Sequence, residues 1–180
     1  MGAGFHGGFG NTRGAKVQNS TNQNTGGEKK IVRHYVETKT LRTHIENPDV
    51  SGSLRSGVKG GHREDNFRSA LNNIGARIVK TIDYPGLDGI KVIYYQLPKK
   101  DISGKPTSEF RNQLMTKTVY DHNKLSTHDY IAKGLEAANN SAKNSNNGRL
   151  SREWSGVDNQ GITWRGYCDS SGNITSFYPE

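Results

Sequence analysis

Hydrophobic residues are distributed unevenly along this 180-residue chain. Ile, Leu, Val and Phe number 34 in all, yet residues 1–30 contain only three of them. Residues 1–27 are instead rich in Gly, Asn, Thr and Gln and show no periodicity, which is typical of a flexible leader or linker. The pattern therefore predicts such a leader over residues 1–27 and one folded domain over residues 28–180.

Three stretches carry apolar residues at helical spacing. Residues 28–41 are predicted to form the first helix, although their β-branched residues also allow a strand. Asp65 is the expected N-cap of the second helix, which Gly75 closes. Its apolar face consists of Phe67, Ala70, Leu71 and Ile74. Ser126 has the position of an N-cap before the third helix, which the polar stretch 139–148 is expected to end.

Runs of alternating or β-branched residues, separated by Gly-containing turns, predict strands. The expected strands are residues 77–84, 90–97, 113–120, 153–157, 161–167 and 173–178. The last three form a meander, because the turn sequences 158–161 and 169–172 separate them. The turn-rich stretches 46–61 and 98–109 are predicted to be loops. Helices followed by antiparallel strands indicate an α+β fold.

Charge and composition narrow the class of protein. The chain has 25 Lys and Arg against 17 Asp and Glu, a formal net charge of +8. This favours a polyanionic partner such as RNA, but an acidic protein would fit as well. No apolar run approaches the length of a transmembrane helix, and the first residues lack the apolar segment of a signal peptide. The single Cys168 excludes an internal disulfide framework and a Cys-based zinc finger.

Two of the six histidines lie in loop-like settings, where catalytic residues concentrate. His44 lies shortly before a proline, and His62 follows Gly60 and Gly61. Two imidazoles that titrate near neutrality can supply a base and an acid in one turnover. The paired glycines let backbone amides approach a phosphoryl oxygen, and Lys117 offers a cation. These residue types suit metal-independent cleavage of RNA by its own 2′-hydroxyl.

Each of these residues also has a less specific interpretation. Loop histidines are most often solvated, a Gly-Gly pair is most often a turn, and a strand lysine often only covers apolar surface. Lys124 is a second candidate for the cation. The remaining histidines carry no motif and are interpreted as solvated or structural: His6, His34, His122 and His128.

The C-terminal stretch 164–179 resembles the final hairpin of the EndoU endoribonuclease family, which ends in a Gly-containing turn followed by Thr/Ser-Phe-Tyr-Pro. Three further segments resemble the family in the same order along the chain. These are His44-Ile-x-x-x-Asp49, Gly60-Gly61-His62 and Lys117-Thr-Val-Tyr. The resemblance extends over residues 40–180.

This resemblance implies an α+β fold of two small antiparallel β-sheets flanked by helices, with a cleft between them. It also implies cleavage of single-stranded RNA, usually at uridylates, to leave a 2′,3′-cyclic phosphate. His62 would accept the proton of the 2′-hydroxyl, and His44 would protonate the leaving 5′-oxygen. Lys117 would stabilise charge on the phosphoryl oxygens, assisted by an amide of Gly60 or Gly61.

The resemblance places the base and ribose against Ser176 and Tyr178, with the tyrosine ring available for stacking. Tyr178 would also suit a core position in the meander. Asp121 stands where the family has a small polar residue that helps to read uracil. An ionised carboxylate only accepts hydrogen bonds, which favours an exocyclic amine instead. The other large aromatics near the C-terminus are expected in the core: Trp154, Trp164, Tyr167 and Phe177.

No cofactor is implied, although a divalent ion such as Mn²⁺ or Mg²⁺ acting on the RNA is left open. Bacterial members of the family often form the C-terminal toxin of a larger secreted protein and are paired with an immunity protein. The resemblance thus implies a toxin that cleaves single-stranded RNA or tRNA, but not DNA, in the cytoplasm of a target cell. The alternative is a non-catalytic RNA-binding or protein-interaction module on the same fold.

Overall fold

The computed structural model describes residues 30–180, and the leader predicted over residues 1–27 lies outside the described residues. The helices are α1 (Lys39–Glu46), α2 (Ser53–Ser56), α3 (Glu64–Asn73) and α4 (Thr127–Asn144). The strands are β1 (Pro48–Asp49), β2 (Lys59–Gly60), β3 (Arg77–Asp83), β4 (Ile90–Gln96), β5 (Pro98–Lys100), β6 (Pro106–Phe110), β7 (Met115–Tyr120), β8 (Glu153–Val157), β9 (Thr163–Cys168) and β10 (Ile174–Pro179). None of these helices is long and apolar enough to cross a membrane.

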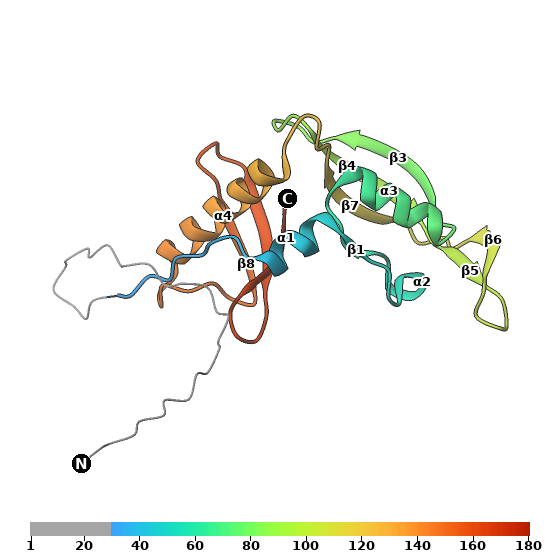
Figure 1. The fold of residues 1–180 in the computed structure, drawn as a ribbon, viewed down its shortest axis with the longest axis horizontal. Coiled ribbons are helices and arrows are strands. Elements are labelled where there is room, and N and C mark those ends of the chain that lie inside the picture. Colours follow the sequence, from blue (N-terminus) through green and yellow to red (C-terminus); the bar gives the residue numbers. More distant parts are fainter. Residues whose placement is uncertain (1–29) are drawn as a thin grey trace, which may run out of the picture.

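The elements form two lobes (Figure 1). In the N-terminal lobe, α3 packs on an antiparallel sheet of order β3-β4-β7, and the hairpin β5-β6 projects from its far end. In the C-terminal lobe, α4 packs on an antiparallel sheet of order β10-β9-β8. Helix α1 lies between the lobes and contacts β10. The predicted α+β fold of two small antiparallel sheets flanked by helices is confirmed.

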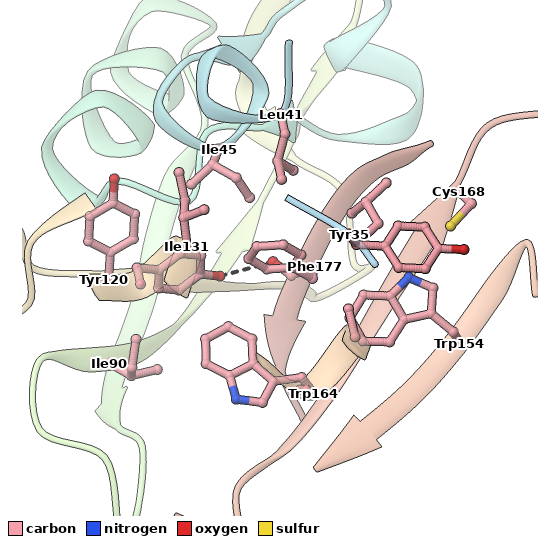
Figure 2. Packing of buried hydrophobic residues seen from close by; sticks show 14 of the residues in the cluster. Tyr35, Leu41, Ile45, Ile90, Tyr120, Ile131, Trp154, Trp164, Cys168 and Phe177 are labelled. Atoms are coloured by element: carbon pink, nitrogen blue, oxygen red, sulfur yellow. Dashed lines mark hydrogen bonds between the residues drawn. The ribbon is translucent and has the colours of Figure 1, made fainter. Parts of the chain in front are cut away.

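Aromatic side chains fill the core of the C-terminal lobe (Figure 2). The rings of Trp164 and Phe177 are fully buried and meet edge to face, with centroids 5.8 Å apart. Trp154 is also buried and meets Phe177 at 6.3 Å. Gly134 on α4 leaves room for the Phe177 ring, because a β-carbon there would lie 2.1 Å from it. The predicted core positions of Trp154, Trp164 and Phe177 are confirmed.

The prediction of a first helix over residues 28–41 is wrong. Residues 30–38 form neither helix nor strand, and α1 begins only after Thr38, whose hydroxyl accepts a hydrogen bond from the N–H of Leu41. The backbone N–H and C=O of Tyr35 bond instead to the side chain of Asn139 on α4. The N–H of Arg33 donates to the carbonyl of Gly148 at 2.9 Å, so these backbone groups have partners outside a local helix.

The other two predicted helices are confirmed, with shifted ends. Asp65 lies in the first turn of α3 and is not its cap, because Arg63 holds the N-cap position. Ser126 caps α4 as predicted and accepts the N–H of Asp129 at 3.1 Å. The polar stretch 139–148 does not end α4 at its beginning, because Ala142 is fully buried in the core and extends the helix.

The predicted strands are found within a few residues, but the two predicted loops contain short regular elements. Residues 98–109 form most of the hairpin β5-β6, and residues 46–61 contain β1, α2 and β2. The side chain of Arg111 donates hydrogen bonds to the carbonyls of Leu54 and Arg55, at 2.5 and 3.3 Å. Such contacts between distant segments hold α2 in place and leave no local pattern in the sequence.

The turn between β8 and β9 is built around the buried Asp158. Its Oδ1 accepts the N–H groups of Gln160 and Ile162, each at 2.9 Å, as expected for the predicted turn. Its Oδ2 accepts the indole N–H of Trp164 at 3.0 Å. One carboxylate therefore links the turn to the aromatic core.

We expect Asp158→Ala to lower the free energy of unfolding by about 2–4 kcal/mol, because a buried indole N–H and two backbone N–H groups lose a charged acceptor. Urea unfolding followed by circular dichroism measures this. Asp169→Ala is the matched control, since Asp169 accepts two backbone N–H groups in the next turn and the side-chain amide of Asn173 in place of an indole. An equal loss in both variants would show that the indole bond adds no more stability than this amide bond.

Candidate active site

A pocket of about 450 Å³ is lined by residues of both lobes. Six of the predicted site residues line it: His44, Gly60, His62, Lys117, Ser176 and Tyr178. A larger hollow of about 590 Å³ lies between α4 and β8, and its lining is mostly Asn and Ser side chains without any histidine. The pocket is therefore the place where the predicted chemistry gathers, and it occupies the predicted cleft.

Backbone hydrogen bonds bring the two predicted catalytic histidines together. The N–H of Gly61 donates to the carbonyl of His44 at 2.9 Å, and the N–H of His62 donates to the carbonyl of Ile45 at 2.6 Å. Both carbonyls lie in the last turn of α1, where helical partners are missing. A β-carbon at Gly60, where φ is +59°, would lie 3.1 Å from the ring of His44. The Gly-Gly pair thus permits the close approach.

His62 is only 3% exposed. Its Nδ1 lies 2.9 Å from the carbonyl oxygen of Thr118, and its Nε2 lies 3.2 Å from Oγ of Ser176. Because a carbonyl can only accept, Nδ1 carries the proton and Nε2 of the neutral ring accepts from the serine hydroxyl. Burial, and secondly the charge of Lys117, hold the pKa of His62 well below its usual value. His62 is therefore a neutral base whose lone pair faces Ser176.

The ring of His62 lies between two tyrosine rings. Its centroid is 6.1 Å from that of Tyr130 and 6.2 Å from that of Tyr178, with interplanar angles of 26° and 15°. The hydroxyl of Tyr130 donates to the carbonyl of Phe177 at 3.0 Å. Since Phe177 points into the core, Ser176 and Tyr178 on either side of it point into the pocket. Tyr178 thus lines the site and not the core.

Tyr167 was expected in the core, and that prediction is wrong. It is 37% exposed and lines the pocket, because the alternation of β9 turns Trp164 inward and Tyr167 outward. Its partner across the β9-β10 pair is Ser176. Burial and a hydrogen bond with Tyr167 raise the pKa of Tyr178 to about 12, so that hydroxyl stays protonated. Counting back across the 169–172 turn would not have located Tyr167, because the register shifts between Ile174 and Ser176. Alternation from Trp164 along β9 is the signal that would have placed Tyr167 on the outer face.

His44 is half-buried near the end of α1. Burial, and then the positive charge of Lys117, lower the pKa of His44, whereas the negative charge of Asp49 raises it. Lys117 thus acts on both histidines, since its charge also lowers the pKa of His62. The ammonium of Lys117 therefore disfavours the protonated form of both imidazoles.

Lys117 projects from β7, opposite Ile93 on the central strand β4. Its Nζ lies 5.8 Å from the ring centroid of the buried Phe67 on α3. Burial lowers the pKa of Lys117 to about 8, so the ammonium is easier to deprotonate than an exposed one. The competing candidate, Lys124, pairs with Asp88 at 3.1 Å and does not line the pocket.

Two predicted site residues do not line the pocket. The N–H of Gly61 is already bonded to His44 and is not free for a phosphoryl oxygen. The carboxylate of Asp121 accepts the N–H of Asn123 at 3.0 Å and lies 3.9 Å from Nζ of Lys91. The histidines without a motif, His34, His122 and His128, also lie outside it, and His6 is outside the described residues. Within residues 30–180, no group of three or more His, Cys, Asp or Glu could hold a metal ion.

Comparison with known proteins finds matches over the same part of the chain. The model of a family described as bacterial EndoU nuclease matches residues 38–180. A protein named tRNA nuclease CdiA from Yersinia mollaretii is 29% identical over 137 residues, which cover 76% of this chain and 4% of that protein. A protein of the same name from Escherichia coli (strain STEC_O31) is 28% identical over 133 residues, covering 71% and 4%. The chain therefore spans only a small part of the length of these relatives.

Proposed function

Because the chain belongs to the bacterial EndoU nuclease family, we propose that it is an endoribonuclease that cleaves RNA through the 2′-hydroxyl next to the cut phosphate. The product ends are a 2′,3′-cyclic phosphate and a free 5′-hydroxyl. The observation that carries this proposal is that one pocket holds His44, His62 and Lys117, with Nε2 of His62 free of a proton.

His62 is the general base. Its Nε2 takes the proton of the 2′-hydroxyl while the 2′-oxygen forms a bond to phosphorus. In the free protein the hydroxyl of Ser176 donates its hydrogen bond to this nitrogen. The substrate hydroxyl approaches Nε2 from the same side. The hydrogen bond from Nδ1 to the carbonyl of Thr118 fixes the ring in the tautomer that the step requires.

His44 is the general acid. It gives a proton to the 5′-oxygen as the bond between that oxygen and phosphorus breaks. Asp49 supports this assignment, because its charge favours the protonated form of His44. For His62, the charges of Lys117 and His44 both disfavour protonation and so lower its pKa.

Lys117 stabilises the negative charge that develops on the phosphoryl oxygens. A charge in a water-poor pocket acts more strongly than one in bulk water. Ser176 and Tyr178 hold the nucleoside that carries the 2′-hydroxyl, with its base against the tyrosine ring. Tyr167, which is hydrogen-bonded to Tyr178, lines the same side of the pocket.

We extend this proposal to tRNA as the substrate, since both relatives are named tRNA nuclease. The domain would act as an antibacterial toxin, secreted as the C-terminal part of a larger protein and active in the cytoplasm of the target cell. A cognate immunity protein would bind the domain in the producing cell. The small share of each relative's length that the chain covers is consistent with such a parent protein.

The proposal is tested by incubating the purified protein with tRNA and with single-stranded RNA of mixed sequence in EDTA, followed by analysis of the new 3′ ends. We expect cyclic phosphate ends. A substrate with a single 2′-deoxynucleotide at the main cut site is the matched control and should stay intact there. Ends with a 3′-hydroxyl, or cleavage of the deoxy control, would contradict the mechanism. Cleavage that requires added Mn²⁺ or Mg²⁺ would contradict metal independence, and the cut sites report the base preference that Asp121 was predicted to influence.

A further inference from the structure

The two ends of the pocket differ in chemistry. At one end, His62 lies beside the hydroxyl of Ser176 and the ring of Tyr178. At the other end, the ring of His44 lies against the segment 56–60, which joins α2 to β2. Most of the side chains that this segment contributes to the pocket have no part in the chemistry described above.

The order of bonds along RNA gives this second end a role. The nucleoside that carries the 2′-hydroxyl lies at His62, and the leaving 5′-oxygen lies at His44. The chain beyond that oxygen must therefore pass the segment 56–60. We propose that this segment, with Met115, binds the nucleotide on the 3′ side of the cut, and that Lys59 pairs with the next phosphate. The assignment rests on the proposed function, because it uses the roles of the two histidines.

Met115 offers an apolar surface to this nucleotide. It is partly exposed in the pocket lining, and the buried side chains of Val58 and Tyr95 line the pocket with it. A β-carbon at Gly57 would lie 2.5 Å from Cε of Met115 and 2.7 Å from the hydroxyl of Tyr95. The segment thus rests directly on the methionine, whose flexible thioether suits packing against a flat base.

A positive charge stands at the edge of this surface. Lys59 is exposed, lines the pocket and has no carboxylate within 4.0 Å among residues 30–180. Its partner across the β1-β2 pair is Asp49, whose carboxylate accepts the N–H of Ser51 at 2.9 Å and forms no ion pair with Lys59. Hydrogen bonds from Ser51, and less strongly the charge of Lys59, lower the pKa of Asp49. Arg111 holds the preceding turn in place through the carbonyls of α2. The ammonium of Lys59 is therefore presented by a preformed segment and remains available to a phosphate.

The experiment uses two RNAs with the same cut site. One RNA ends at the nucleoside after the cut, and the other continues by one nucleotide and so adds only the next phosphate. The ratio of kcat/KM between the long and short RNAs should be about tenfold for the wild type and should fall to near one in Lys59→Gln. Lys143→Gln, which removes a charge at the far end of α4, is the matched control and should keep the ratio.

A binding measurement gives an independent readout. With 2′-deoxy-substituted versions of both RNAs, the slope of log Kd against log salt should fall by about 0.7 in Lys59→Gln on the long RNA only. A ratio and a slope that match those of the wild type would overturn this inference and leave the proposed function intact. Failure of the wild type to cleave any RNA would instead contradict the proposed function.

Discussion

Replacement of His62 by alanine is expected to lower kcat/KM for RNA cleavage by as much as about 10⁴-fold, the upper end of what a general base contributes. Its Nε2 is the acceptor that faces Ser176, where the substrate hydroxyl enters. Because the pKa of His62 is held well below its usual value, the ring is neutral and ready to act over a wide range of pH. Initial cleavage rates of the wild type and the variant, measured on an RNA with one cut site, give the loss.

The control must separate lost chemistry from lost structure, because His62 is buried between two tyrosine rings. His62→Gln keeps a side chain of similar length that can still bond to Thr118 but cannot take a proton, and it should be as inactive as the alanine variant. His128→Ala, at an exposed position on α4, should cleave like the wild type. A folded His62→Gln variant with more than a tenth of the wild-type rate would exclude His62 as the base.

The sequence was sufficient to predict that His62 lies beside α1 in the pocket, because the evidence there is local. The glycines before His62 have positive φ and allow contact with α1, which only glycine accommodates without strain. The orientation of side chains on the C-terminal strand could also be predicted from the sequence. Alternation around one core aromatic, Phe177, turns Ser176 and Tyr178 to the opposite face. Short motifs thus predicted six of the residues that line the pocket, but not Tyr167.

Other features of the site depend on contacts between distant residues and could not be predicted. Tyr130 reaches the ring of His62 from α4, and Phe67 reaches Lys117 from α3. The failed prediction of a helix over residues 28–41 has the same origin, because Asn139, more than a hundred residues later, bonds to the backbone of Tyr35. Local periodicity contains no information about such partners.

Lys117→Met is expected to lower kcat by about 10²–10³-fold, the usual loss when a group that stabilises transition-state charge is removed. Methionine has a similar length and can cover Phe67 as the lysine does, so packing should change little. The loss should fall on kcat more than on KM, because the charge matters most when the phosphoryl oxygens become more negative. Single-turnover rates at saturating protein measure it directly.

The pH dependence distinguishes this role from a structural one. His62 must be neutral and His44 protonated, so the rate rises through the pKa of the first and falls through the pKa of the second. Lys117 lowers both pKa values, and Lys117→Met should therefore move the whole profile to higher pH. In the wild type the fall should steepen above pH 8, because the pKa of Lys117 is about 8 and the ammonium is lost there.

Lys117→Arg is the matched control, because a guanidinium stays charged at every pH of the profile. In Lys117→Arg, the rise through the pKa of His62 and the fall through the pKa of His44 should stay at their wild-type pH values. Only the steepening above pH 8 should disappear. The three profiles together assign the steepening above pH 8 to Lys117. If the Met variant kept both the wild-type rate and the wild-type profile, Lys117 would support the pocket only by packing on Phe67. In that case another cation would have to meet the charge on the phosphoryl oxygens.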